Sequence, residues 1–578
     1  MAKLIGCRRL TPVALALGMT LTACRTVRPP GPKLYVVESQ NTDAVSRYDI
    51  LELSFKHNGA YENNFFDVEL QTVFTSPDGI QHLAKGFFYG GDLWKVRFRP
   101  DQPGTWSYSY TFSSKSGFKE QGSGSFRCTP SSEQGPIRRD PQNQYRWVFA
   151  SGKSYFPVGL EECVYARDGR LPGTAIDGED RNHPGRTVSW DEYFSVYGRA
   201  GFNLFRFSQK NCSYSLMDDL DHYRVAQSIA TDSLLAAASK HGFRVMFGFF
   251  GIHGNWSSDN RTVRVLTRTM NQALRRHVEA LSDPEDHELV QKEERLIEYC
   301  IARWGVYTDF WELLNERQAA DKWTTMMAEY TRSVDPDQKP ISTSWEKPDL
   351  PDIDINAPHW YESEDELSSD LRVQEQAAKW KRAGKPVIVG EQGNSGMNWD
   401  PGSAVRMRIR SWTAVFQEIS LIFWNTSWSK AGMFGGHYTP GQGANIYLGP
   451  EERKYVQVLQ GFASKLDANV RMSPVAITSP TLVHSYGLFS KDVGAVYLQH
   501  AASHTTPAQG AKLSFDFSSM SHPRLIGEWI DPATGEVLSR VKISPRQLTL
   551  SVPSFNVDIS LLVTSQPSGQ RPSSQNLQ

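Results

Sequence analysis

Two glutamates in the middle of the chain follow short apolar runs and form a pair that could do chemistry. Glu316 follows the run 310–314, and Glu391 follows the run 386–389. Two carboxyl groups on opposite sides of one site can cleave a glycosidic bond by double displacement. One group protonates the leaving oxygen while the other attacks the anomeric carbon from the opposite face, at a separation of about 5–5.5 Å. The two runs must therefore end close together in the fold.

Strand–helix alternation between residues 136 and 468 predicts a fold that meets this requirement. Amphipathic stretches such as 229–241 and 288–304 separate short apolar runs, which is typical of parallel βαβ units. The runs are continuous rather than alternating, as expected for strands buried on both faces. Eight runs predict one (β/α)₈ TIM barrel, in which chemistry lies at the C-terminal ends of the strands. The predicted strands are 155–160, 203–207, 244–249, 310–314, 340–344, 353–356, 386–389 and 421–424.

Two further charged residues lie within the predicted strands. Arg206 lies inside the second strand, and a charge in an apolar strand needs a carboxylate partner, which Glu391 would provide. Glu312 lies in the fourth strand, two residues before its last position. We interpret Glu312 as a buried structural carboxylate that pairs with an arginine rather than as a catalytic group.

Histidines follow two of the predicted strands. His253 comes after the third strand and His359 after the sixth. Both are candidate substrate contacts, whereas the alternative for each, taken singly, is a core histidine with satisfied hydrogen bonds. His359 shares a strand face with Tyr361, because side chains two residues apart in a strand point the same way. This pairing favours His359 as a substrate contact.

The strand-end residues together resemble clan A of the glycoside hydrolases, the group that includes the family 5 cellulases and mannanases. The resemblance rests on Asn-Glu after the fourth strand and Glu after the seventh in one barrel. It implies that Glu316 is the acid/base and Glu391 the nucleophile of a retaining glycosidase. It also implies that Asn315 hydrogen-bonds the sugar 2-hydroxyl, and that Arg206 and Tyr361 support the nucleophile.

Tryptophans near the predicted strand ends have different interpretations. By the same resemblance, Trp424 at the end of the eighth strand forms the floor beneath the sugar at subsite −1. Trp428 and His437, in the long loop after that strand, are expected to line the substrate groove. Trp304, Trp311 and Trp345 are interpreted as packing residues, since tryptophan is also ordinary core material.

Both flanks of the barrel have β patterns, so the fold class is a multidomain chain with an N-terminal and a C-terminal β-sandwich. Residues 34–130 alternate apolar and polar positions between turn signals such as Asp101-Gln102-Pro103-Gly104. The stretch 96–106 resembles a sandwich domain of unassigned function that precedes the barrel in some bacterial clan A proteins. Residues 470–564 form the second sandwich, whose stretch 529–536 resembles small C-terminal domains sometimes described as collagen-binding.

The first residues read as an export signal. Basic residues precede a short apolar run and the site Leu21-Thr22-Ala23-Cys24, which resembles the lipobox of bacterial lipoproteins. Residues 1–24 are thus expected to be a signal peptide, with Cys24 acylated as the anchor. An ordinary signal peptide is the alternative. Because position 25 is Arg rather than Asp, the outer membrane is the expected destination. Residues 25–33 form a tether, and residues 565–578 a disordered tail.

Composition limits the partners. The formal net charge of −1 argues against nucleic acid or an anionic membrane surface as the main partner. Of six cysteines, four remain in the mature chain outside the anchor, and they lack the C-x-x-C spacing of a metal site. No metal or other cofactor is expected. Cys163 and Cys212 follow neighbouring strands and could be bridged, but free buried thiols are an equal alternative.

Three hypotheses follow from these patterns. The first is a retaining glycosidase acting on a poly- or oligosaccharide. The second is a catalytically inactive, carbohydrate-binding surface lipoprotein, which would predict a replaced catalytic glutamate, whereas both are present. The third is a structural or adhesive protein, which gives no reason for the polar residues at the strand ends. The first is preferred; the sugar, the linkage, exo or endo action and the oligomeric state stay open.

Overall fold

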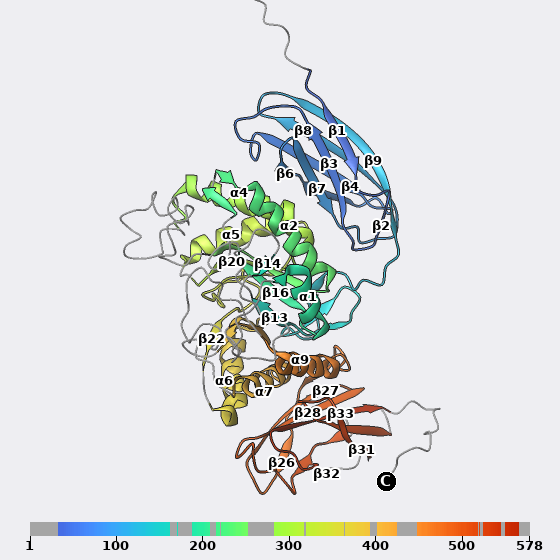
Figure 1. Ribbon diagram of the computed structural model, residues 1–578, viewed down its shortest axis with the longest axis vertical. Helices are drawn as coiled ribbons and strands as arrows, with labels where there is room; N and C mark the ends of the chain where they lie inside the picture. The colour runs from blue at the N-terminus through green and yellow to red at the C-terminus, as the bar shows by residue number, and fades with distance from the viewer. Residues whose placement is uncertain are drawn as a thin grey trace, which may run out of the picture.

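Three regions follow one another along the long axis of the computed structural model (Figure 1). A β-rich N-terminal region lies at one end, a parallel sheet wrapped by helices in the middle, and further antiparallel sheets at the other end. The predicted residues Cys24, Cys163, Cys212, His253 and Trp428 lie outside the part of the chain that the structure describes. The structure describes residues 33–161, 170–171, 188–208, 216–219, 221–251, 283–316, 319–362, 365–393, 402–424, 448–517, 520, 524–544 and 549–565.

The N-terminal region consists of two sheets that share one core, which agrees with the predicted sandwich. Their orders are β1-β3-β7-β6 and β2-β9-β8-β4-β5. Alternation along β3 buries Leu51, Leu53 and Phe55 completely, and Phe55 packs edge-on against Tyr110 of the facing sheet with ring centroids 4.8 Å apart. The strands are β1 (Val36–Gln40), β2 (Ala44–Ser46), β3 (Leu51–His57), β4 (Val68–Thr75), β5 (Gln81–Lys85), β6 (Phe87–Gly90), β7 (Leu93–Phe98), β8 (Gly104–Ser114) and β9 (Lys119–Thr129).

The middle region is a curled, eight-stranded parallel sheet of the TIM-barrel type. Its order, β21-β20-β19-β16-β13-β24-β23-β22, is that of a (β/α)₈ barrel read from the fifth strand round to the sixth. At the seam, the backbone N–H groups of Asp354 and Ile355 donate to the carbonyl of Ile341 (2.8 and 3.2 Å). The strands are β13 (Val158–Glu161), β16 (Leu204–Ser208), β19 (Arg244–Gly251), β20 (Phe310–Asn315), β21 (Ile341–Ser342), β22 (His359–Tyr361), β23 (Ile388–Gly393) and β24 (Ser420–Phe423).

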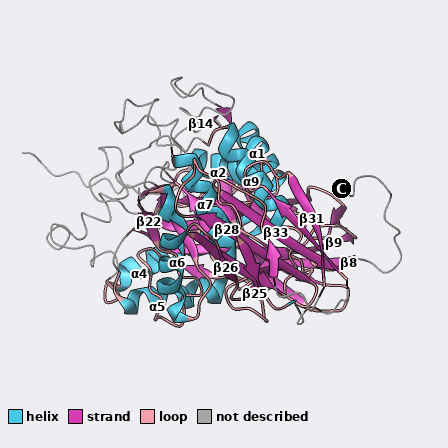
Figure 2. Cartoon of the chain, turned by 90° about the horizontal axis from the view of Figure 1, so that it is seen from below, coloured by secondary structure: helices cyan, strands magenta, loops and turns pink. Residues whose placement is uncertain are grey.

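Helices are concentrated around this sheet (Figure 2). Two of them begin at side-chain caps that their sequences supply: Ser189 accepts from the N–H of Glu192, and Asp286 from that of Leu289. None of the described helices is long and apolar enough to cross a membrane. The helices are α1 (Trp190–Arg199), α2 (Val225–Lys240), α4 (His287–Trp304), α5 (Asp321–Val334), α6 (Ser369–Trp380), α7 (Ser403–Phe416) and α9 (Pro450–Ala463), with 3₁₀ turns η2 (Gly305–Tyr307), η3 (Glu366–Ser368) and η4 (Lys381–Ala383).

The sixth strand lies later in the chain than predicted. The expected strand 353–356 forms only a single bridge, from Asn356 to Val387, and regular pairing begins at His359. Pro358 lies between the two segments and has no N–H with which to continue the ladder. The other seven predicted strands all overlap observed ones.

The C-terminal region contains a six-stranded and a three-stranded antiparallel sheet, ordered β25-β27-β28-β33-β30-β31 and β26-β29-β32. The larger sheet packs on α7, where Trp412 stacks on Tyr497 and Arg408 forms two 3.0 Å bonds with the buried Asp558. The strands are β25 (Arg471–Met472), β26 (Ala476–Thr478), β27 (Val483–Phe489), β28 (Val493–His500), β29 (Lys512–Ser514), β30 (Leu525–Ile530), β31 (Val537–Ile543), β32 (Thr549–Ser551) and β33 (Asp558–Ser565). The remaining described strands form a short three-stranded sheet, β10 (Ile137–Arg139), β11 (Trp147–Phe149) and β12 (Ser154–Tyr155), and two pairs, β14 (Arg170–Leu171) with β15 (Val188–Ser189) and β17 (Met217–Asp219) with β18 (His222–Tyr223).

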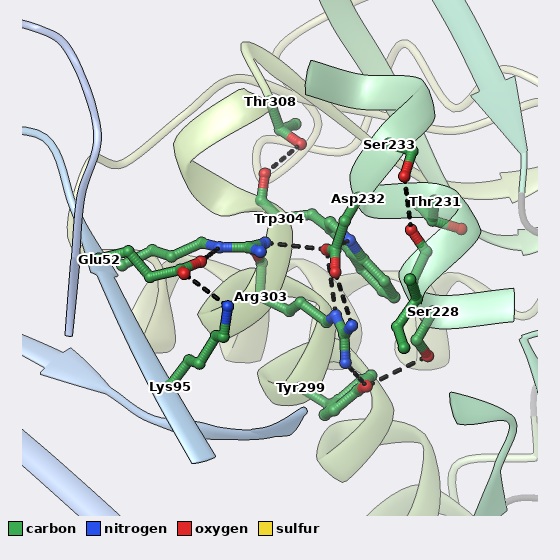
Figure 3. A network of polar contacts seen from close by, with 12 residues as sticks. Glu52, Lys95, Ser228, Thr231, Asp232, Ser233, Tyr299, Arg303, Trp304 and Thr308 are labelled. Carbon is green, nitrogen blue, oxygen red and sulfur yellow. Dashed lines mark hydrogen bonds and ion pairs between the residues drawn. The ribbon is translucent and has the colours of Figure 1, made fainter. Parts of the chain in front are cut away.

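A buried polar network joins the N-terminal sheets to the barrel helices. Figure 3 shows Asp232 of α2 facing Arg303 and Trp304 of α4. Asp232 accepts hydrogen bonds from both side chains, at 2.6 and 2.8 Å for the shortest contact of each. Arg97 of β7 donates to Asp232 (2.9 Å) and to Glu52 of β3 (2.9 Å). The N-terminal sheet is therefore held on the barrel by charges as well as by apolar contact.

Candidate active site

Arg206 is the centre of the candidate site. Its side chain is fully buried at the C-terminal half of β16 and contacts three carboxylates. Nη1 donates to Glu161 Oε2 (2.7 Å) and to Glu391 Oε1 (2.9 Å), while Nη2 donates to both oxygens of Glu312 (2.9 and 2.8 Å). Glu161 and Arg206 are register partners in adjacent parallel strands, which places their side chains on the same face. One guanidinium thus joins strands β13, β16, β20 and β23.

Glu391 lies on β23 and is only 6% exposed. Besides the bond from Arg206 to Oε1, its Oε2 accepts a hydrogen bond from the Tyr361 hydroxyl. His359 is the register partner of Glu391 on the neighbouring strand, and its Nδ1 lies 3.5 Å from Oε2. Both oxygens of Glu391 are therefore oriented by fixed polar groups.

Glu316 follows β20 in a left-handed backbone conformation, with φ +50°. Such a conformation costs a non-glycine residue about 1 kcal/mol or more, and it turns the side chain out of the strand's alternation. Glu316 Oε1 lies 2.8 Å from His359 Nδ1, and its side chain is 17% exposed. The other ring nitrogen of His359 lies 2.9 Å from Ser344 Oγ, which fixes the ring. His359 thus stands between the two glutamates.

The carboxyl groups of Glu316 and Glu391 lie close together. One oxygen of each, with a ring nitrogen of His359, fits within a mutual distance of 4.8 Å. Three such atoms could in principle surround a cation. Here Arg206 and Tyr361 already donate to Glu391, and His359 links the two carboxyl groups, so the donors fit a shared-proton cluster better than a metal site.

Burial and crowding shift the acid–base properties of the cluster. Burial raises the pKa of Glu161 well above its usual range, against the lowering effect of Arg206, and Glu391 and Glu312 raise it further. Burial also raises the pKa of Glu312. Burial and the adjacent Glu391 raise the pKa of the Tyr361 hydroxyl, so Tyr361 stays a donor. Burial lowers the pKa of Arg206, but the carboxylates raise it by more, so its charge is permanent.

The structure places two further predicted residues beside this cluster. Asn315 precedes Glu316, is 2% exposed, and accepts from Arg206 Nη2 through Oδ1. That bond fixes the amide so that its NH₂ group is the end left to donate. Trp424 directly follows β24 and is buried, and its backbone N–H donates to the backbone carbonyl of Gln392 (2.8 Å). The expectation that Glu312 pairs with an arginine is met by its two-oxygen contact with Arg206.

The sequence analysis missed two residues of the site. Glu161 is the last residue of β13 and ends an apolar run. Like Arg206, it is a charged residue in an apolar strand and needs a partner of opposite charge, and this signal could have identified it. Trp345, interpreted above as packing, is 41% exposed, and its ring centroid lies 6.3 Å from that of His359. The packing interpretation is wrong for Trp345, whereas Trp304 and Trp311 are fully buried.

Comparisons with known proteins agree with this architecture. A family model described as a domain of unknown function, DUF5060, matches residues 44–113, which confirms the predicted N-terminal domain of unassigned function. No protein with a curated description matches the sequence. Among solved structures, a provisionally assigned glycoside hydrolase from Bacteroides vulgatus ATCC 8482 is 16% identical, with a TM-score of 0.59, over 90% of this chain and 100% of that one. A glycoside hydrolase family 5 protein from the same organism is 13% identical, with a TM-score of 0.50, over 75% and 94% of the two chains. At these identities the likeness is one of fold.

Proposed function

We propose that the protein is a retaining glycoside hydrolase that acts on a poly- or oligosaccharide. The observation that carries this proposal is the pair Glu316 and Glu391, whose nearest oxygens lie within 4.8 Å of each other. That spacing suits direct attack by one carboxylate on the sugar, which needs carboxyl groups about 5–5.5 Å apart. An inverting enzyme needs about 6.5–9.5 Å, to leave room for a water molecule. The naming of both fold relatives as glycoside hydrolases supports the proposal.

In this mechanism the two carboxyl groups have distinct roles. Glu391, oriented through both oxygens by Arg206 and Tyr361, attacks the anomeric carbon. Glu316 gives its proton to the leaving oxygen as the glycosidic bond breaks, and a glycosyl ester forms on Glu391. Glu316, now ionised, then takes a proton from water, whose oxygen displaces Glu391 and releases the sugar. Asn315, with its amide fixed by Arg206, is positioned to donate to the 2-hydroxyl, and Trp424 to lie beneath the sugar.

Variants of the two glutamates test the proposal because they should fail differently. Glu391→Ala removes the attacking group, so turnover should vanish for every leaving group. Azide or formate should restore some activity and give a product of inverted configuration. Glu316→Ala should lower the rate on natural substrate by about 10² to 10⁴-fold. It should still react with an aryl glycoside of an acidic phenol and accumulate the covalent intermediate, visible by mass spectrometry.

The wild-type product gives the decisive observation. NMR of the first-formed sugar should show retention of the anomeric configuration. Inversion by the wild-type protein, or near-normal activity of Glu391→Ala, would exclude the assignment. Measurable sugar binding without turnover on any member of a polysaccharide panel would instead favour the inactive carbohydrate-binding protein.

We also propose that the chain is exported and anchored to a membrane, in the outer membrane, through lipid on Cys24. The support is the Leu21-Thr22-Ala23-Cys24 pattern behind a basic and apolar leader. Cys24→Ser should release the protein from the membrane fraction or block its processing. An unchanged membrane pool with normal processing would rule the anchor out.

A further inference from the structure

The candidate site holds more buried negative groups than its arginine can neutralise. Glu161, Glu312 and Glu391 are 3%, 0% and 6% exposed, and all three accept from Arg206, which is itself fully buried. If all three carboxylates were ionised, two uncompensated charges would be buried within one cluster. An isolated buried charge is costly enough that such groups commonly take up a proton instead.

The hydrogen bonds identify which carboxyl group holds the proton. Glu312 accepts three hydrogen bonds from Arg206, through Nε and Nη2, in the fork geometry of a strong ion pair. Glu391 must be ionised to attack a sugar. Glu161 accepts one bond from Arg206, from the same Nη1 that donates to Glu391. Glu161 is therefore the group whose charge is least compensated.

We propose that Glu161 is a neutral carboxylic acid in the working site and donates its proton in a hydrogen bond to Glu391, as a positioning residue for the nucleophile. The inference rests on the proposed role of Glu391. Because Arg206 Nη1 is shared, Glu161 and Glu391 lie side by side, and a hydrogen bond between two carboxyl groups requires one proton. The proton is shared rather than transferred, so no bond is broken in this step. Glu161 Oε2 and Glu391 Oε1 lie 2.7 and 2.9 Å from that shared nitrogen, and the proximity of Glu391 contributes to the raised pKa of Glu161.

The surroundings of Glu161 favour the neutral form. Within the part of the chain that the structure describes, the charged or titratable groups that face it are Arg206 from β16, Glu312 from β20, Glu391 from β23 and Tyr361 from β22. Its other neighbour, β24, presents Ser420–Phe423, which carry no charge. Among these described groups, the single guanidinium of Arg206 faces Glu161 and two other carboxylates. With Glu161 neutral, the four side chains carry a net charge of −1 instead of the −2 of the fully ionised state.

The first test compares two replacements by activity. Glu161→Gln puts a neutral hydrogen-bond donor in place of the acid, so kcat/KM at pH 5 should stay within about tenfold of wild type. Glu161→Ala should lower it by about 10²-fold, the effect expected from losing a hydrogen bond to a charged group. The basic limb of the pH profile should move to higher pH in Glu161→Gln, because the amide cannot ionise and compete for Arg206. Equal loss in both variants with an unchanged pH profile would overturn the proposal.

The second test needs no activity. A raised pKa in the folded state means that the stability contribution of Glu161 is fully present below its unfolded pKa, near 4.5, and is lost as pH rises. Glu161→Gln lacks this loss, so its stability relative to wild type should grow above about pH 4.5, by up to about tenfold in the folding equilibrium constant per pH unit. Denaturant titrations from pH 4 to 8 measure this. A pH-independent difference would overturn the proposal.

Glu312→Gln is the matched control, since it makes the same chemical change on the neighbouring carboxylate. It should lose stability even at pH 5 and lose at least about 10²-fold in kcat/KM, because it breaks the ion pair with Arg206. Similar behaviour of the two Gln variants would contradict the assignment of the proton to Glu161. If no glycoside were cleaved by the wild type, the proposed function would fail while the stability test still decided this inference.

Discussion

Two buried arginine clusters in this molecule have opposite charge balances. In the site, the single cation Arg206 contacts three carboxylates. At the junction of the N-terminal sheets with the barrel, three cations share two carboxylates: Asp232 accepts from Arg97 and Arg303, and Glu52 accepts from Arg97 and Lys95 (Figure 3). Burial acts to raise the pKa of Asp232, but Arg303 and Arg97 lower it below its usual value. The corresponding group of the site, Glu161, shifts the other way.

The difference separates a structural from a chemical use of the same residue types. Where cations outnumber carboxylates, the cations lower the pKa of the buried Asp232, and the cluster holds the N-terminal sheets on the barrel. Where carboxylates outnumber the cation, at least one carboxyl group keeps its proton. That group can then change its protonation state near the pH at which the protein works. The side chains of the site carboxylates are at most 8% exposed, whereas that of Glu52 at the junction is 20% exposed, so the charge count and the deeper burial of the site act in the same direction.

The largest effect is expected from removing Arg206, the one arginine that the described residues place among the three carboxylates. Arg206→Met leaves three buried carboxylates without their donor, so kcat/KM should fall by at least about 10²-fold and stability by about 3 to 5 kcal/mol. Arg206→Lys restores the charge but not the fork geometry, and should recover only part of either loss. Steady-state kinetics with denaturant titration measure both quantities. If Arg206→Met kept more than a tenth of wild-type activity, the guanidinium would not orient the nucleophile.

Breaking the junction cluster should affect stability alone. Asp232→Asn leaves Arg97 and Arg303 without their shared carboxylate, so the free energy of unfolding should drop by about 3 to 5 kcal/mol while kcat/KM of the folded protein is unchanged. The exposed pair Arg540–Glu528 (2.8 Å) is a matched control, for which Glu528→Gln should cost under about 1 kcal/mol. A fall in kcat/KM for Asp232→Asn would show that the junction and the site are coupled.

The two clusters should respond to pH with opposite signs. The folded-state pKa of Asp232 is depressed, so its contribution to stability is present above its unfolded pKa, near 3.8, and is lost as pH falls below that value. The stability advantage of wild type over Asp232→Asn should therefore be constant above about pH 5 and shrink as the solution is acidified. Denaturant titrations from pH 3 to 7 measure it. An advantage that grows on acidification would contradict the ion-pair account of the junction.

The smallest effect is expected at the rim of the site. Trp345 is exposed beside His359, which contacts the predicted acid/base Glu316, so its ring is placed to stack on the sugar of the leaving group. Trp345→Ala should raise KM for oligosaccharides by about 2- to 10-fold, the range of an aromatic contact. The KM of an aryl glycoside without a leaving sugar should change less. Equal changes in KM for both substrates would show that Trp345 does not contact the sugar of the leaving group.

Most strands of the middle region could be predicted because a buried strand, and the residue at which it ends, both appear in a short stretch of sequence. Apolar runs such as 310–314 fit only a strand buried on both faces, and the residue after the run falls at the strand end where the barrel gathers side chains. The sixth strand was misplaced because its pairing depends on Pro358 and on the register with β23, which is a non-local property.

The excess of carboxylates around Arg206 could not be predicted in the same way. It depends on carboxylates from three strands converging on the guanidinium of a fourth, and no single run shows that number. The exposure of Trp345 is similarly set by what neighbouring elements leave uncovered. His359 lies between the two glutamates because it is the register partner of Glu391 on the neighbouring strand. The sequence pattern indicated only that His359 shares a strand face with Tyr361.

The apolar core of the barrel extends into both flanking regions, although each flank also has a separate core of its own. One continuous cluster of buried side chains includes Phe87 of the N-terminal sheets, Trp304 and Trp412 of the barrel helices, and Tyr497 of the C-terminal sheet. Regions that share a core cannot open one at a time without exposing their neighbours' apolar surface to water. The chain should therefore melt in a single calorimetric transition, and a barrel produced without its flanking sheets should be insoluble. Natural recombination could exchange such a barrel only together with the sheets on either side of it.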